Sequence, residues 1–129
     1  MTTDLLMLAY TATLCVILAF PYTLALIAKV GPLKAVSYPQ PSHDECADWV
    51  HRAKRAHMNL VENLPVFAAI VLVAHVAGLA NATTALGAQI FFWARIAMAI
   101  AHIGGIPAVR SVSWFVSLAG LVMILLQIF

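Results

Sequence analysis

Three long stretches of the chain carry no charged side chain, and they constrain its fold more than any other feature of the sequence. They cover 24 residues from Leu5 to Ala28, 32 residues from Asn63 to Ala94 and 19 residues from Ser111 to Phe129. An α-helix needs about 20 apolar residues to cross the ~30 Å hydrocarbon core of a bilayer. Only 9% of the residues are charged and 64% are hydrophobic, whereas roughly a quarter are charged in a soluble domain. The sequence therefore predicts an integral membrane protein, and it excludes nucleic-acid enzymes and secreted disulfide scaffolds.

Glycine and proline divide this apolar chain into helices. Gly31-Pro32 ends the first helix, and the run from Gly104 to Pro107 separates the last two. The predicted helices cover about residues 4–29, 44–77, 84–103 and 108–128. The expected fold class is an all-α bundle of four transmembrane helices in up-down topology, forming one domain over residues 1–129.

Polar residues precede the second and third helices and are candidate N-caps. Ser42 or Asp44 is expected to cap the second helix, and Asn81, Thr83 or Thr84 the third. The second helix would be longer than the hydrocarbon core is thick, so we expect its charged first turns to lie at the membrane surface.

The basic residues predict the orientation of the helices in the membrane. Six basic residues near helix ends lie on one side of the membrane: Lys29, Lys34, Arg52, Lys54, Arg55 and Arg110. The opposite side has no basic residue. Basic residues favour the cytoplasmic side. We therefore expect a multi-pass protein, of a bacterial inner membrane, with both termini outside the cytoplasm and with the loops around 31–43 and 104–110 inside it.

The second predicted helix carries most of the polar side chains. At 100° per residue, five of them share an arc of about 100°: Arg52, Arg55, Asn59, Glu62 and Asn63. Lys54 and His57 lie on other faces. A helix start that faces lipid headgroups is an alternative explanation for Arg52, Lys54 and Arg55.

Glu62 and Arg95 are expected at nearly the same depth, on the cytoplasmic side of the membrane midplane. A charged group there costs several kcal/mol unless it is paired or hydrated, so we expect these two residues to interact. The pair would either be purely structural or line a polar pocket open to the cytoplasm. His102, two helical turns after Arg95, would lie near the mouth of that pocket.

A motif in the second helix resembles a known family. The run Lys54-Arg55-Ala56-His57-Met58-Asn59-Leu60-Val61-Glu62-Asn63-Leu64-Pro65 is similar to the signature helix of the MAPEG superfamily, membrane-associated proteins of eicosanoid and glutathione metabolism. The position of His57 resembles the microsomal glutathione transferase branch. Ala94-Arg95-Ile96 and the run from Arg110 to Phe115 resemble that branch in the third and fourth helices.

The resemblance implies a homotrimer that binds glutathione between neighbouring subunits, in the cytoplasmic half of the membrane. The positions that match glutathione-contacting ones are Arg55, His57, Asn59, Glu62 and Arg95, and Lys54 stands at such a position where an arginine is usual. Glutathione has two carboxylates and an amine, which suit guanidinium groups and an acid respectively. Its thiol is held as a thiolate by nearby positive charge, a role that fits Arg110. Glutathione would be a co-substrate, and no metal is implied.

The chain departs from the family pattern at two positions. His102 stands where the transferase branch tends to carry a tyrosine, and Met98 where leukotriene synthases carry one. A neutral imidazole can donate one hydrogen bond to a thiolate, as a phenol does. We therefore take His102 and Arg110 as the candidate catalytic residues.

Three classes of function are consistent with the sequence. The first is an enzyme that joins glutathione to lipophilic electrophiles delivered through membrane lipid, or that reduces lipid hydroperoxides. The second is a non-catalytic protein that binds glutathione, a lipid or a partner protein. The third, a small multidrug transporter, is disfavoured because the arginines near Glu62 would repel cations.

Overall fold

The computed structural model describes all residues from 1 to 129 and consists of helices and connecting turns. Its four long helices are α1 (Thr3–Val30), α3 (Asp48–Val76), α4 (Ala82–Gly104) and α5 (Pro107–Ile128). A short helix, α2 (Pro32–Ala35), lies in the connection between α1 and α3. Each long helix has the length and the apolar composition to cross a membrane. The predicted all-α bundle of four transmembrane helices is confirmed.

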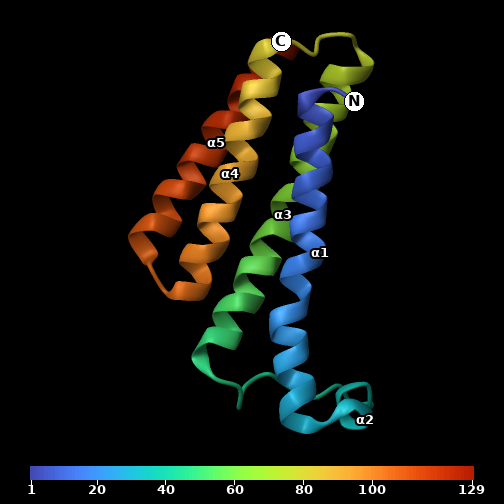
Figure 1. Ribbon diagram of the computed structural model, residues 1–129, viewed down its shortest axis with the longest axis vertical. Coiled ribbons are helices and arrows are strands. Elements are labelled where there is room, and N and C mark those ends of the chain that lie inside the picture. Colours follow the sequence, from blue (N-terminus) through green and yellow to red (C-terminus); the bar gives the residue numbers. More distant parts are fainter.

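The four long helices run alternately up and down (Figure 1). Both chain termini lie at one end of the bundle, and the connection that contains α2 lies at the other. Helices α4 and α5 form a hairpin and pack against each other along their lengths, while α1 packs mainly against α3. We call the end that carries α2 the loop end and the opposite end the terminal end.

The helix boundaries agree with the sequence except at the start of α3. That helix begins at Asp48, four residues later than the predicted residue 44, and the predicted loop contains the unforeseen α2. Ser42 Oγ accepts a hydrogen bond from Asp44 N at 3.0 Å, but this contact closes a turn before the helix. The N-cap of α3 is Ala47, whose side chain caps nothing. The prediction that Ser42 or Asp44 caps this helix is therefore wrong.

The start of α4 is capped as the sequence predicts. Asn81 Oδ1 accepts hydrogen bonds from the backbone N–H groups of Thr83 and Thr84, at 2.8 and 3.1 Å. Thr84 Oγ1 in turn accepts one from Asn81 N at 2.9 Å. This reciprocal arrangement satisfies donors that a helix leaves free at its first turn. Thr84 also donates to the carboxylate of Asp4, which is only 2% exposed, so the first turn of α1 is tied to α4.

The packed core lies toward the terminal end. Its members come from the start of α1, the end of α3, the start of α4 and the end of α5: Met7, Phe67, Val71, Ala74, Ala88, Phe91, Phe92 and Ile124. The rings of Phe67 and Phe91 stack with their centroids 4.0 Å apart, which joins α3 to α4. A smaller cluster of Leu18, Leu60 and Ala99 lies nearer the middle of the helices.

Two glycines set the close approach of α4 and α5. A Cβ atom added at Gly120 would lie 2.5 Å from the carbonyl oxygen of Gly87, and one added at Gly87 would lie 2.6 Å from that of Gly120. Real Cβ atoms do not approach backbone oxygens so closely, so only glycine fits at both positions. The α4–α5 hairpin is therefore held at a spacing that larger residues would open.

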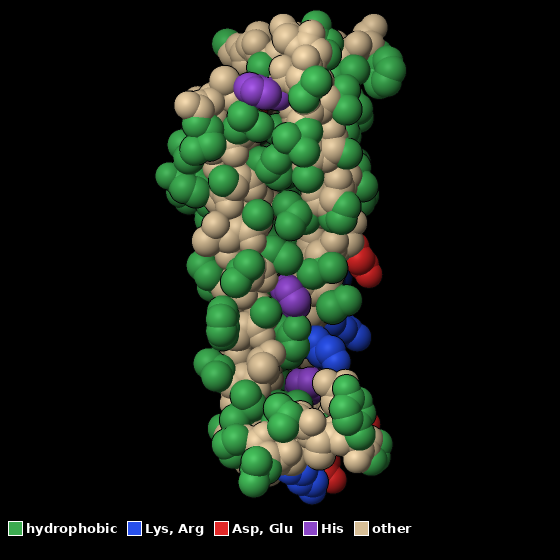
Figure 2. Space-filling model, turned by 90° about the vertical axis from the view of Figure 1, so that its right-hand side faces the viewer, with side chains coloured by type: hydrophobic (Ala, Val, Ile, Leu, Met, Phe, Trp, Pro, Cys, Tyr) green, Lys and Arg blue, Asp and Glu red, His purple; other side chains and the backbone are tan.

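The outer surface of the bundle is mostly apolar, and polar groups gather toward the loop end. Only 26 of the 129 residues are buried, so most hydrophobic side chains face outward, as expected of helices that contact lipid or other subunits. Figure 2 shows hydrophobic side chains over much of one face and the Lys and Arg side chains in its lower half. Most of the basic side chains therefore lie on the loop-end side of the packed core.

Candidate functional site

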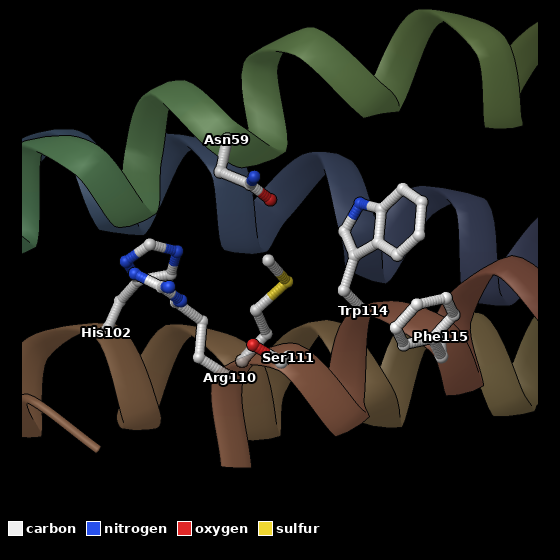
Figure 3. A pocket seen from close by; sticks show the side chains of 7 residues that line it. Asn59, His102, Arg110, Ser111, Trp114 and Phe115 are labelled. Atoms are coloured by element: carbon white, nitrogen blue, oxygen red, sulfur yellow. The ribbon is translucent and has the colours of Figure 1, made fainter. Parts of the chain in front are cut away.

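A cleft opens between α3, α4 and α5 on the loop-end side of the core. Its volume is about 350 Å³, within the range of small-molecule sites. Seven side chains line it: Asn59, Met98, His102, Arg110, Ser111, Trp114 and Phe115. Figure 3 shows Asn59 pointing from α3 toward the side chains of α4 and α5. The cleft therefore brings together both predicted catalytic residues, His102 and Arg110, with one predicted glutathione contact, Asn59.

Arg95 lies at the contact between α3 and α4, next to two residues that line the cleft. It is 5% exposed, and one of its terminal nitrogens donates to Asn59 Oδ1 at 2.7 Å and lies 3.4 Å from Met98 Sδ. Its guanidinium carbon lies 4.9 Å from the centre of the Phe91 ring, the geometry of a cation–π contact. The Nε atom of Arg95 is buried and has no hydrogen-bond partner. The guanidinium is thus held beside the cleft with part of its hydrogen-bonding capacity free.

Arg95 does not pair with Glu62, so that prediction is wrong within this chain. Its partner on α3 is Asn59, one helical turn before Glu62, and the side chain of Glu62 is exposed. Three residues rotate a helix by about 300°, so a helix that turns Asn59 toward α4 directs Glu62 about 60° away. Matching depth along two helices did not ensure that both side chains face each other.

A second, basic crevice adjoins the cleft. It has a volume of about 230 Å³ and shares His102 and Arg110 with the cleft, while Arg52 and Arg55 line its α3 side. Arg52 Nε donates to the carbonyl oxygen of Ile103 at 3.0 Å, which ties the start of α3 to the end of α4. The Nε2 atom of His102 is buried and unpartnered. No acidic side chain lines the cleft or the crevice, so both favour an anionic ligand.

Two residues predicted to contact glutathione lie on the other side of α3. His57 Nδ1 and the hydroxyl of Tyr22 on α1 form a hydrogen bond of 2.7 Å. Lys54 is exposed and lines a separate cavity beside the end of α1. Of the predicted contacts, Asn59 lines the cleft, Arg55 lines the crevice and Arg95 is bonded to Asn59, whereas Lys54, His57 and Glu62 line neither space.

Sequence reasoning missed three residues that line the cleft: Ser111, Trp114 and Phe115. Tryptophan is common at membrane interfaces, but Trp114 lines the cleft. The signal was present in the spacing. Residues at i, i+1, i+4 and i+5 share one side of a helix, so these three share the side of α5 that carries Arg110. Without knowledge of which side faces α3, that spacing alone did not identify a site.

The basic side chains that line the cleft and the crevice suit an anionic ligand. Arginine binds carboxylates with paired donors, and positive charge lowers the cost of holding a thiolate. The chain contains no cluster of three or more His, Cys, Asp or Glu side chains that could hold a metal ion. The arginines, the imidazole of His102 and the hydroxyl of Ser111 are therefore the groups that a ligand would meet.

Comparison with known proteins places the chain in a family. No curated protein matches the sequence. The MAPEG family pattern matches residues 5–129, which include every residue of the cleft and the four long helices except the first two residues of α1. With the four membrane-spanning helices and the cleft described above, this match shows that the chain belongs to the MAPEG family, multi-pass membrane proteins of glutathione and eicosanoid metabolism.

Proposed function

We propose that the chain is a glutathione transferase of the microsomal branch, with peroxidase activity toward lipid hydroperoxides as the related reaction. The observation that carries the proposal is the cleft itself. Arg110 and His102 reach it from two helices, Asn59 lines it and is bonded to the nearly buried Arg95, and no acidic side chain lines it. A tripeptide with two carboxylates and a thiol matches such a site in charge.

In this proposal glutathione binds across both the basic crevice and the cleft. Arg55 and Arg95 would hold its carboxylates, with Asn59 as an additional hydrogen-bonding group. Glu62, exposed on α3, would bind the glutathione amine in a neighbouring subunit's site, because a homotrimer places α3 against another copy. Arg110 would stabilise the thiolate by its charge, and His102 would donate a hydrogen bond to it.

The second substrate would arrive from the bilayer. Phe115 is 65% exposed and Trp114 is 37% exposed, so the α5 side of the cleft opens toward the lipid-facing surface. The thiolate sulfur would form a bond to an electrophilic carbon, and the leaving group would depart with its electron pair. With a lipid hydroperoxide, two glutathione molecules would be oxidised to the disulfide while the hydroperoxide is reduced to an alcohol and water.

We further propose that the loop end faces the cytoplasm. The basic residues of the loop end, among them Lys29, Lys34 and Arg110, favour that side. Both termini would then lie outside the cytoplasm, and the cleft would be open to cytoplasmic glutathione. A bacterial inner membrane is the location that we propose.

The experiment combines binding, thiolate formation and turnover in purified full-length protein in nanodiscs. Glutathione binding is measured by calorimetry, thiolate by ultraviolet difference absorbance, and turnover with chlorodinitrobenzene and a fatty-acid hydroperoxide. We expect Arg110→Leu to lower both the thiolate signal and turnover, by about a hundredfold or more for turnover. His102→Phe should lower turnover while binding stays within severalfold, and Lys34→Leu, exposed on α2, is the matched control.

The outcomes separate the enzyme from a binding protein. Loss of glutathione binding in Arg55→Leu and Arg95→Leu, with binding kept in Lys34→Leu, supports the proposed site. If the wild-type protein binds glutathione but forms no thiolate and turns over neither substrate, the enzyme proposal fails and a non-catalytic glutathione-binding protein replaces it.

A further inference from the structure

A second cavity lies on the α1 side of α3, apart from the cleft and the basic crevice. Its volume is about 590 Å³, in the middle of the range for small-molecule sites. It lies between the last turns of α1, the connection that contains α2, and Lys54 of α3. None of its lining residues lines the cleft or the crevice, so it is a separate space from the proposed glutathione site.

The lining of this cavity is amphipathic. One part is apolar and is formed by Leu26 and Ile27 of α1 with Ala35 and Val36 of the connection. The remaining part is polar, and Lys54 is its only fully charged side chain. No Asp or Glu lines the cavity, so nothing in its wall neutralises Lys54. An apolar chain that ends in an anionic group complements both parts.

His43 supplies a second observation that points to a ligand. Its Nε2 atom is buried and has no hydrogen-bond partner, which is costly for a polar group. Its ring lies 5.7 Å from that of Tyr22, another lining residue, but the Tyr22 hydroxyl is already bonded to His57. His43 and Lys54 therefore give the polar part of the lining two side-chain donors for an anionic head group.

The position of the cavity suits a ligand that comes from the membrane. Tyr22 lies about 12 Å along α1 from its end at Val30, and Lys54 lies about 9 Å along α3 from Asp48, at 1.5 Å per residue. The cavity therefore reaches from the polar connection into the apolar part of the bundle. This is the depth at which the head group of an amphiphile meets its chain.

We propose that this cavity binds a single-chain amphiphile with an anionic head group, either a carboxylate or a phosphate. The head group contacts Lys54 and His43, and the acyl chain lies along Leu26, Ile27 and Val36. The site is independent of the proposed glutathione chemistry.

The test uses photoreactive lipids on the full-length protein in nanodiscs of zwitterionic lipid. Three probes carry the same diazirine-bearing chain: a free fatty acid, a lysophosphatidic acid and the neutral methyl ester of the acid. After illumination, labelled peptides are mapped by mass spectrometry. We expect at least one anionic probe to label the end of α1 or residues 35–43 about fivefold more than the ester does, the effect of one basic residue near the surface. The probe that labels more strongly identifies the head group.

Two pairs of variants sharpen the test. Lys54→Met should reduce anionic labelling to the level of the ester, whereas Lys34→Met, which changes an exposed lysine outside the cavity, should not. Ala35→Trp should fill the cavity and block labelling, whereas Ala28→Trp on the exposed side of α1 should not. Thermal unfolding of each variant shows that it is folded.

Labelling by both anionic probes that only equals labelling by the ester, or unchanged labelling in both Lys54→Met and Ala35→Trp, overturns the proposal. Glutathione binding is measured in the same samples. The two sites share no residue. A sample that lacks the expected lipid labelling but binds glutathione therefore contradicts only the lipid proposal. A sample that shows the labelling but binds no glutathione contradicts only the proposed function of the cleft.

Discussion

At the scale of single residues, Arg95 is notable as a charged side chain that is nearly buried within a membrane-spanning helix. Its nearly buried guanidinium is bonded to Asn59 across the α3–α4 contact. We expect a double-mutant cycle with Asn59→Leu and Arg95→Leu to show a coupling energy of about 1–2 kcal/mol in the free energy of unfolding. The same cycle with Glu62→Gln and Arg95→Leu should show additive losses, because Glu62 is exposed and does not contact Arg95. Coupling in the second cycle but not the first would contradict this assignment.

His43 gives a prediction for pH dependence outside the membrane spans. Burial lowers the pKa of His43, the charges of Lys54 and His51 lower it further, and Tyr22 and Asp44 oppose the shift. The fold therefore favours the neutral imidazole. Its contribution to stability is complete above the ordinary pKa of ~6.5 and is lost as the pH falls through that value toward the lowered pKa.

An NMR titration of the histidine ring signals measures this shift, with His43→Gln identifying the resonance. We expect a midpoint below ~6.5 in nanodiscs that contain no anionic lipid. His43→Gln should also lose less stability than the wild-type protein between about pH 7.5 and 5.5. A midpoint at or above the ordinary value would show that His43 is not buried beside these cations.

At the scale of elements, the α4–α5 hairpin depends on the contact of Gly87 and Gly120. Gly120→Ala places a Cβ 2.5 Å from a backbone oxygen that cannot move without the helix. We expect this variant to lower the free energy of unfolding by about 1–3 kcal/mol, the range for overpacked sites. Gly104→Ala is the matched control, since its Cβ would meet only Ile106, at 3.7 Å. Thermal unfolding in detergent compares them, and equal stability of the two variants would contradict a close approach.

At the scale of the whole molecule, the exposed polar side chains of α3 must be shielded from lipid by another protein surface. Glu62 lies about 21 Å along α3 from Asp48 and is exposed. A carboxylate at that depth in contact with lipid costs several kcal/mol. We expect native mass spectrometry in nanodiscs to give three copies of the chain, because a ring of subunits buries this face of each α3 against a neighbour. A monodisperse monomer or dimer would remove the subunit interface from the proposed glutathione site.

Much of the architecture follows from the sequence alone. The uncharged stretches predict the spans because the cost of charge in hydrocarbon limits where a helix can cross. The Asn81 cap follows from local hydrogen bonding that involves only neighbouring residues. His102 and Arg110 lie together because each is near the Gly104–Pro107 turn, which brings the end of α4 next to the start of α5. These features depend on local chemistry or on short separations along the chain.

Only the tertiary structure decided which side chains of different helices meet. Arg95 forms its hydrogen bond with Asn59 and not with Glu62. His57 forms one with Tyr22 and does not face the cleft. Each outcome depends on the rotation of a helix about its axis, where one residue is about 100°. That rotation is set by packing among Phe67, Phe91 and their neighbours, and by the close contact of Gly87 with Gly120. These contacts join residues far apart in the sequence, so no local pattern could reveal them.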